Sequence, residues 1–256
     1  MSERLNGKVA IVTGAGSRGP GLGNGKATSI LFAREGARVL CVDLVKERAE
    51  ETVGLIRAEG GTAEAFPADV TRAADCDAVV EAARERWGRL DILHNNVGIE
   101  SRKPLLETSE EEWDQVMAVD LKSMFLMTRS AARAMTAAGG GGSVVCVSSV
   151  AALRGHGRTA YAAAKAGIIG FVRTVAVQLG PQGIRVNAIA PGQVWTPMVQ
   201  SLGPEARERR RRANPLQTEG SAWDVGWGAV YLASDEARWV TGQVLVIDGG
   251  LTLTTP

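Results

Sequence analysis

The segment YAAAK, residues 161–165, places the phenol of Tyr161 and the ammonium of Lys165 four residues apart. On a helix this spacing puts both side chains on one face, so the lysine can lie close to the tyrosine. A tyrosine loses its proton only at about pH 10 unless a neighbouring cation favours the phenolate. Tyr161 beside Lys165 is therefore a candidate general acid and base at neutral pH. An apolar run ending in Ser148 and Ser149 precedes the pair, and either serine offers a hydroxyl to the same pocket.

A second group of residues suited to chemistry is the glycine-rich stretch TGAGSRGPGLGNGKA, residues 13–27. It follows a short apolar run and opens a helical pattern, and Asp43 ends the next apolar run. In that context glycines permit a tight turn and a close approach of the backbone to a pyrophosphate, whose charge lies at the helix N-terminus. The acidic residue binds the ribose hydroxyls. The sequence therefore predicts a dinucleotide site.

Short β-branched runs alternate with helical patterns along the whole chain. The runs are apolar almost throughout, which indicates strands that are buried on both faces of a parallel sheet. Strands that alternate with helices predict an α/β fold with a doubly wound sheet of about seven strands flanked by helices. The expected strands are 8–13, 37–43, 62–70, 90–96, 143–149, 184–191 and 243–248, and the expected helices are 26–35, 46–58, 73–87, 110–137, 160–179 and 221–233.

Composition excludes several classes of protein. A chain of 256 residues without an internal linker suits one domain, residues 1–256. Lys and Arg number 29 against 28 Asp and Glu, so no net field attracts nucleic acid or a membrane surface. Three widely spaced cysteines and two histidines argue against a disulfide framework and a metal site, and His94 and His156 are expected to be structural. Without a long apolar run, we expect a soluble, untargeted, cytoplasmic protein.

Residues 192–220 hold prolines, glycines and no strand pattern, which predicts a mobile excursion over the substrate site. This segment contains the run RERRRR, residues 207–212. The run favours a solvated helix face, and recognition of an anionic substrate and binding of nucleic acid remain as alternatives.

Six motifs together resemble the short-chain dehydrogenase/reductase family over nearly the whole chain: TGAGS with GNGKA, NNVG at 95–98, VSSVAA at 147–152, YAAAK, NAIAPGQVWTPM at 187–198 and TGQVLVIDGG at 241–250. The resemblance implies a Rossmann domain, a nicotinamide cofactor, and hydride transfer between that cofactor and a secondary alcohol or ketone. It also implies that Tyr161 is the general acid and base. Lys165 would favour the ionised tyrosine and hold the nicotinamide ribose, and a serine would bind the substrate oxygen.

Two catalytic positions depart from the family pattern or leave alternatives open. The local motif VSSVA assigns the catalytic serine to Ser149, whereas the spacing of thirteen residues to Tyr161 would assign it to Ser148; we prefer the motif because the loop before Tyr161 can lose one residue. Asp120 stands where the family usually has an asparagine that anchors a water in a proton relay to the lysine. Asp120 can still accept from that water but adds a charge that faces Lys165, unless it is only a polar residue in a helix kink.

The resemblance also implies the cofactor-binding residues. Counted back from the first helix, Gly14, Gly23 and Gly25 form the cofactor turn, and residues 18–22 are an insertion; the alternative is that Gly19 or Gly21 carries the turn. Asn95, Val97 and Gly98 resemble the segment that backs the adenosine. The full set implied to bind cofactor is Gly14, Gly23, Asn24, Gly25, Asp43, Asp69, Val70, Asn96, Val97, Gly98, Tyr161, Lys165, Pro191, Gly192, Val194 and Thr196.

The choice of cofactor depends on two residues of opposite charge. A basic residue in the glycine turn, here Arg18, is common among relatives that bind the 2′-phosphate of NADP. Asp43 would repel that phosphate, and we expect Asp43 to prevail, with Arg18 facing solvent or the pyrophosphate.

The sequence is thus interpreted as an NAD-dependent alcohol dehydrogenase or carbonyl reductase, a homotetramer like many relatives, with a small-molecule substrate. The alternatives are a catalytically silent nucleotide-binding sensor of the same fold and a nucleic-acid binder. Substrate-lining candidates are Leu153, His156, Trp195, Met198 and Leu202.

Overall fold

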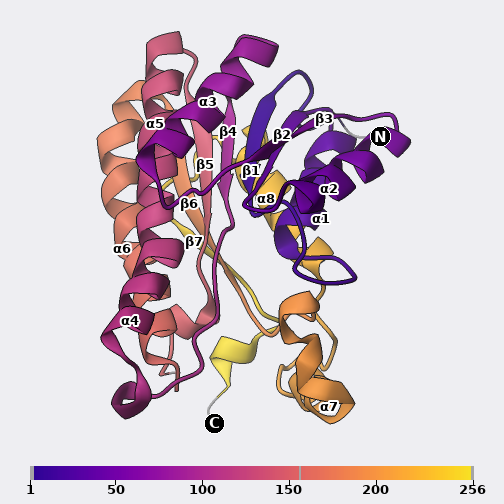
Figure 1. Ribbon diagram of the computed structural model, residues 1–256, viewed down its shortest axis with the longest axis vertical. Helices are drawn as coiled ribbons and strands as arrows, with labels where there is room; N and C mark the ends of the chain where they lie inside the picture. The colour runs from indigo at the N-terminus through magenta and orange to yellow at the C-terminus, as the bar shows by residue number, and fades with distance from the viewer. Residues whose placement is uncertain (1–2, 156, 255–256) are drawn as a thin grey trace.

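The computed structural model describes residues 3–155 and 157–254, and its centre is one parallel sheet of seven strands (Figure 1). The strand order is β3-β2-β1-β4-β5-β6-β7, and every neighbouring pair is parallel. Apolar side chains on both faces explain the buried strands, and the doubly wound α/β fold is confirmed. The strands are β1 (Val9–Thr13), β2 (Arg38–Asp43), β3 (Thr62–Pro67), β4 (Ile92–Asn95), β5 (Gly142–Val147), β6 (Ile184–Pro191) and β7 (Val244–Ile247).

Helices cover both faces of the sheet, as Figure 1 shows. On one face, α1 (Asn24–Arg34), α2 (Lys46–Ala58) and α8 (Ala222–Ala233) bury Ile30, Val53 and Val230 in a shared core. On the other face, α3 (Ala73–Trp87), α5 (Ser123–Ala138) and α6 (Thr159–Leu179) bury Val79, Met127 and Ile168 in a second core. The chain changes direction of winding between β1 and β4, and in such sheets ligands bind outside the carboxyl ends of the strands at this point.

The expected helix 110–137 is interrupted, which corrects the sequence interpretation. α4 (Glu110–Val116) and α5 are separated by a π-helical segment, Met117–Lys122, in which Asp120 is fully buried. A π turn holds one more residue than an α turn, so it rotates the side chains that follow it. The wider turn aims Asp120 inward, and the helical periodicity of the sequence gives no sign of it.

The excursion 192–220 contains no named strand among its residues, all of which are described, as the sequence predicts. It holds a 3₁₀ segment, Pro197–Leu202, followed by α7 (Gly203–Arg212). Val194 and Gly220 form an isolated parallel bridge that closes its base. Its mobility remains a prediction.

One helix has a property that the sequence interpretation did not anticipate. Residues 159–182, which include α6, are long and apolar enough to cross a membrane by length and composition, with a mean hydropathy of 1.3. The helix is nonetheless part of the core, because Ile168 and Val172 are fully buried against the sheet. This property is therefore weak evidence for a membrane span.

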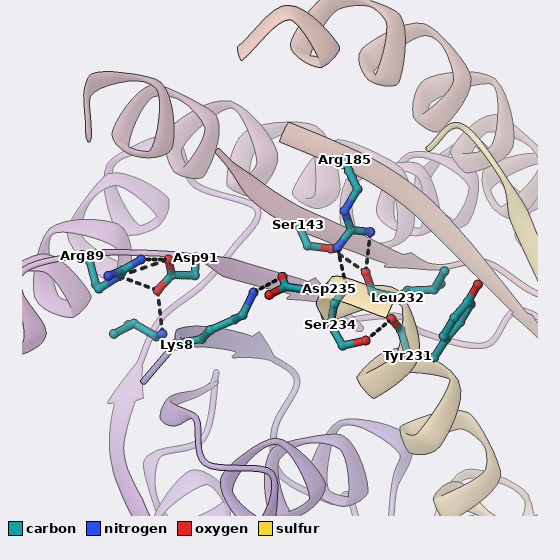
Figure 2. Close-up of polar contacts among 10 residues, drawn as sticks. Lys8, Arg89, Asp91, Ser143, Arg185, Tyr231, Leu232, Ser234 and Asp235 are labelled. Carbon is teal, nitrogen blue, oxygen red and sulfur yellow. Dashed lines mark hydrogen bonds and ion pairs between the residues drawn. The ribbon is translucent and has the colours of Figure 1, made fainter. Parts of the chain in front are cut away.

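Polar contacts at the amino ends of the strands fasten α8 to the sheet (Figure 2). Arg185, near the start of β6, donates from Nη1 to the Leu232 carbonyl at 2.7 Å and from Nη2 to the Ser234 carbonyl at 3.0 Å. The hydroxyl of Ser143 on β5 donates to the same Leu232 carbonyl at 2.9 Å. These carbonyls at the end of α8 lack partners within the helix, so the charged contacts here stabilise the fold. The candidate active site lies at the opposite, carboxyl edge of the sheet.

Candidate active site

A cleft of about 640 Å³ lies at the carboxyl edge of the sheet. The glycine-rich loop forms one wall and the excursion forms another. The cleft brings together the full set of residues implied to bind cofactor, whereas Asn95 does not line it. These residues are Gly14, Gly23, Asn24, Gly25, Asp43, Asp69, Val70, Asn96, Val97, Gly98, Tyr161, Lys165, Pro191, Gly192, Val194 and Thr196.

The turn between β1 and α1 requires glycine at two of the predicted positions. Gly14 has φ +64°, a left-handed conformation that side chains disfavour. A Cβ on Gly25 would lie 2.0 Å from the Gly14 carbonyl oxygen, which no rearrangement of a side chain could relieve. Gly23 is the N-cap of α1, and its amide donates to the Ser17 hydroxyl at 2.9 Å. The first turn of α1 therefore faces the cleft with backbone close to any bound phosphate.

Of the insertion 18–22, Arg18 lines the cleft, whereas the two glycines do not. Gly19 and Gly21 do not line the described cleft and lie near Pro197 of the excursion, and the Gln200 amide donates to the Pro20 carbonyl at 3.3 Å. This geometry favours Gly14, Gly23 and Gly25 as the cofactor turn over the alternative with Gly19 or Gly21.

Gly16 is a cleft residue that the sequence interpretation missed. A Cβ there would meet the Arg48 Cβ at 2.4 Å and the Asp43 Oδ2 at 2.9 Å, so the position is sterically reserved for glycine. The Gly16 amide donates to Asp43 Oδ2 at 3.1 Å, and the Val45 amide donates to Asp43 Oδ1 at 3.0 Å. The close spacing of Gly14 and Gly16 could have indicated this role, but the glycines of the turn were assigned by counting back from the first helix, which left Gly16 out.

Arg18 partly departs from expectation. Its side chain is exposed, but Nη2 also donates to the Gly98 carbonyl at 3.3 Å, on the far side of the cleft. A second arginine, Arg48 on α2, lines the cleft beside Asp43 and was not anticipated. The lining of the cleft thus includes two guanidinium groups, Arg18 and Arg48, in addition to the Asp43 carboxylate.

Tyr161 and Lys165 lie on one face of α6, as their spacing predicts. The Lys165 Nζ is 5.6 Å from the centre of the Tyr161 ring and donates to the Val147 carbonyl at 3.2 Å. Lys165 is only 4% exposed. Burial alone would lower the pKa of Lys165, but the charges of Asp120 and Tyr161 hold it above its usual value. The lysine is thus a cation at neutral pH and favours the phenolate.

Asp120 lies behind the lysine rather than in the lining of the cleft. Its Oδ1 accepts from the Ile99 amide at 2.7 Å, and its Oδ2 is 3.2 Å from the Lys165 Nζ. Both charged groups are buried, so the ion pair is little screened by solvent. Asp120 thus occupies the position at which the family usually has an asparagine, but it contacts Lys165 directly, as an ion pair. Asp120 is a positioning residue for the lysine.

The two serines have different surroundings. The Ser148 hydroxyl is buried and donates to the Lys165 carbonyl at 2.7 Å. The Ser149 oxygen accepts from the Ala151 amide at 3.2 Å, and within the described residues its hydroxyl hydrogen is not committed to an acceptor. Because Ser149 can still donate to a ligand in the cleft, the geometry favours Ser149 as the substrate-binding serine.

Several other candidates prove to be structural. The Asn95 amide is buried and donates to the Thr128 hydroxyl at 3.0 Å, so it lies behind the lining of the cleft and supports it from below. His94 is fully buried, which lowers its pKa to about 3 and keeps it neutral. The other histidine, His156, lies outside the described residues. Cys41, Cys76 and Cys146 are buried free thiols, and no group of three His, Cys, Asp or Glu side chains suited to a metal occurs in the described part of the chain.

The substrate end of the cleft differs most from expectation. Of the proposed lining residues, Met198 lines the cleft, whereas Leu153, Trp195 and Leu202 do not. Trp195 instead lies beneath the guanidinium of Arg207, 5.2 Å from its ring centre. Arg154, Arg158 and Glu100 line this end and were not foreseen. Arg210 also lines it and belongs to the run 207–212, for which recognition of an anionic substrate was one of the alternatives.

Comparison with known proteins agrees with this architecture. Residues 21–252 match the family model described as enoyl-(acyl carrier protein) reductase. The chain is 42% identical over 251 residues to the 3-oxoacyl-(acyl-carrier-protein) reductase FabG of Thermotoga maritima, covering 98% of this chain and all of that one. It is 38% identical to the levodione reductase of Leifsonia aquatica, covering 97% of this chain and 96% of that one.

A crystal structure assigned as a short-chain dehydrogenase/reductase of Burkholderia xenovorans superposes with a TM-score of 0.94 at 40% identity, covering 99% of both chains. Full-length sequence similarity, the matching fold and the family model point to one conclusion. The chain belongs to the short-chain dehydrogenase/reductase family.

Proposed function

We propose that this protein is an NAD-dependent oxidoreductase that interconverts a secondary alcohol and the corresponding ketone. The observation that carries this proposal is the convergence of Ser149, Tyr161 and Lys165 on one cleft beside the glycine turn. The names of similar proteins, which include ketone reductases and hydroxyacyl dehydrogenases, support the same reaction class.

The cleft suits a nicotinamide dinucleotide. Close contact between Gly14 and Gly25 leaves the backbone bare where a pyrophosphate would lie, and the N-terminus of α1 contributes its positive dipole. The buried Asn24 Oδ1 has no hydrogen-bond partner in the described chain, so this residue offers an acceptor that a hydroxyl of the cofactor could use. When bound, the nicotinamide accepts or supplies the hydride.

The protein residues handle the proton. In ketone reduction, the Tyr161 hydroxyl donates its proton to the substrate oxygen while Ser149 donates a hydrogen bond to that oxygen. In alcohol oxidation, the Tyr161 phenolate removes the hydroxyl proton. The charge of Lys165, 5.6 Å from the centre of the tyrosine ring, stabilises negative charge on the phenolic oxygen, and Asp120 keeps the lysine charged and in place.

Tyr161→Phe tests the assigned proton donor. We expect turnover to fall by at least about 100-fold, because general acid–base transfer is lost, while NADH binding is nearly retained. Turnover is measured by NADH absorbance over a panel of ketones and secondary alcohols, and NADH binding by fluorescence titration. Retained activity in the variant would reject the assignment. NADH binding without turnover of any substrate by the wild type would instead favour a silent nucleotide sensor.

Asp43 supports the choice of NAD over NADP. Its carboxylate ends β2 in the cleft, where a 2′-phosphate would meet a like charge. Arg18 and Arg48 act in the opposite sense, but Arg18 is engaged with the Gly98 carbonyl. We expect a preference for NAD of about 100-fold in kcat/KM, since each tenfold corresponds to about 1.4 kcal/mol of repulsion.

Steady-state kinetics with both cofactors on one active substrate test this preference in the wild type and in Asp43→Ala. The preference should shrink in the variant. Equal use of NADP by the wild type, or an unchanged preference in Asp43→Ala, would assign the choice to the arginines of the loop and α2.

Assembly and location are further parts of the proposal. An apolar groove between α5 and α6, which includes the exposed Phe125 and the half-buried Phe171 and Leu179, is suited to contact between copies in a homotetramer. Light scattering of the purified protein would measure its mass in solution. The proposed location is the cytoplasm, where the buried thiols would stay reduced.

A further inference from the structure

Three arginines from separate segments line the substrate end of the cleft. Arg154 follows the turn after Ser149, Arg158 is the N-cap of α6, and Arg210 lies on α7 of the excursion. Arg158 precedes Tyr161 by three residues, which is about 4.5 Å along a helix axis. The arginines therefore border the place where the substrate oxygen meets Tyr161.

Arg210 differs from its neighbours in the arginine run. Arg211 and Arg212 both bind Glu208, at 2.8 Å and 2.6 Å, and Arg209 is 73% exposed. These contacts match the solvated helix face that the sequence predicts for the run. Arg210 instead turns inward and lines the cleft.

The guanidinium of Arg210 is incompletely satisfied. Its Nη2 donates to the Val194 carbonyl at 3.2 Å, but its buried Nε has no hydrogen-bond partner in the described chain. Burial and the nearby charge of Arg158 lower the pKa of Arg210. A half-buried cation whose buried donor is unused, beside a second cation, is unfavourable unless an anion joins them.

The carboxylates near this cluster already bind arginines. Glu100 binds Arg158 through one oxygen and Arg102 through the other, at 2.7 Å for the latter. Arg154 donates to the Leu251 carbonyl, a neutral acceptor, at 2.9 Å. Glu219, the other carboxylate that acts on Arg210, is bound by Arg207. The substrate end of the cleft therefore carries an excess of positive charge.

We propose that Arg154, Arg158 and Arg210 form a subsite for a free carboxylate of the substrate. Resting on the oxidoreductase function proposed above, this inference makes the substrate pair a hydroxy acid and its keto acid. Because Arg158 lies about one helical turn before Tyr161, a carboxylate bound there stands at least two carbons from the reacting carbonyl, as in a 3-oxo acid. Guanidinium forks bind carboxylates through paired hydrogen bonds, which suits this role. In a coenzyme A thioester the phosphates lie at the far end of the pantetheine arm, beyond the reach of this subsite.

The first test compares a short 3-oxo acid, 3-oxobutanoate, with its methyl ester. We expect Arg210→Gln to lower kcat/KM about 10- to 100-fold more for the acid than for the ester, because only the acid loses a charged hydrogen bond. Arg210→Lys, which keeps the charge but not the fork, should fall between the wild type and Arg210→Gln. Arg209→Gln, an exposed neighbour on the same helix, is the matched control and should leave the ratio of acid to ester unchanged. Equal losses for both substrates, or none, would overturn the proposal. So would a preference of the wild type for the ester or the coenzyme A thioester over the acid.

A second measurement does not depend on turnover. Succinate should raise the melting temperature of the wild type and of Arg209→Gln, and should raise that of Arg210→Gln much less. If succinate stabilises all three proteins equally, or none, the carboxylate subsite is rejected. If no alcohol or ketone reacts but succinate binding depends on Arg210, the proposed reaction is wrong while the subsite stands.

Discussion

Replacing Asp120 by asparagine would test how the charge behind Lys165 controls the proton chemistry. The variant restores the residue that the family usually has at this position. Its side-chain oxygen can still accept from the Ile99 amide, now 2.7 Å from Oδ1, so local geometry is largely preserved. The variant removes the negative charge 3.2 Å from the Lys165 Nζ. The effect to be measured is therefore electrostatic.

The magnitude follows from the distances. With an effective dielectric constant of about 20, the Lys165 charge at 5.6 Å from the Tyr161 ring favours the phenolate by about 3 kcal/mol. The Asp120 carboxylate can lie no farther than about 9 Å from that ring, so it opposes the phenolate by at least about 2 kcal/mol. Removing that charge should therefore move the pH dependence of a reaction that uses the phenolate by at least about one pH unit, since 1.36 kcal/mol corresponds to one unit.

The assay is the pH dependence of kcat/KM for alcohol oxidation, in which the phenolate is the base. The acid limb of Asp120→Asn should lie about one pH unit below that of the wild type. The alkaline limb should also move to lower pH. Asp120 holds the pKa of Lys165 above its usual value of 10.5, and in the variant burial lowers that pKa. Superimposable profiles would refute this reasoning, and an acid limb at higher pH would mean that the lysine loses its charge without Asp120.

The remaining predictions concern the serines and the buried histidine. Ser149→Ala should lower kcat by about 100-fold or more, because a donor to the developing oxyanion is lost. Ser148→Ala should mainly lower the free energy of unfolding, by about 1 kcal/mol, because the Lys165 carbonyl loses its donor; the reverse order of effects on kcat would transfer the catalytic role to Ser148. Burial holds the pKa of His94 at about 3 against 6.5 in the unfolded chain, so the unfolded state binds the extra proton as pH falls below about 6.5. Each further pH unit down to about 3 should then lower the free energy of unfolding by about 1.4 kcal/mol, and urea titrations of His94→Phe should show a slope smaller by that amount. Equal slopes would contradict the buried neutral histidine.

The sheet was predictable because its signal is local. Runs such as those of β1, β5 and β6 are apolar on both faces, and that pattern is produced by few structures other than a covered parallel sheet. The motifs also predicted which residues meet in the cleft, because the carboxyl ends of parallel strands lie at one edge of the sheet. For that reason residues as distant in sequence as Gly14 and Thr196 line one cleft.

The π segment around Asp120 depends on contacts that no local pattern encodes. Its wide turn accompanies the bond from the Ile99 amide and the ion pair with Lys165, which come from other parts of the chain. The inward turn of Arg210 was hidden for a related reason. In a run made almost wholly of arginine, helical periodicity cannot distinguish the face that lines a cleft from the face that meets solvent.

The insertion and the excursion, each unusual in the sequence, meet in the structure. Gly19 and Gly21 lie against Pro197, and Gln200 binds the Pro20 carbonyl, so the loop that follows β1 touches the segment that covers the substrate end. Arg18 of the same loop reaches the Gly98 carbonyl across the cleft. A movement of the excursion would therefore change contacts of the cofactor loop. The five extra residues thus extend the nucleotide side of the cleft toward the substrate side. Because the two sides are in contact, changes in the segment that binds the substrate can affect the loop that binds the cofactor.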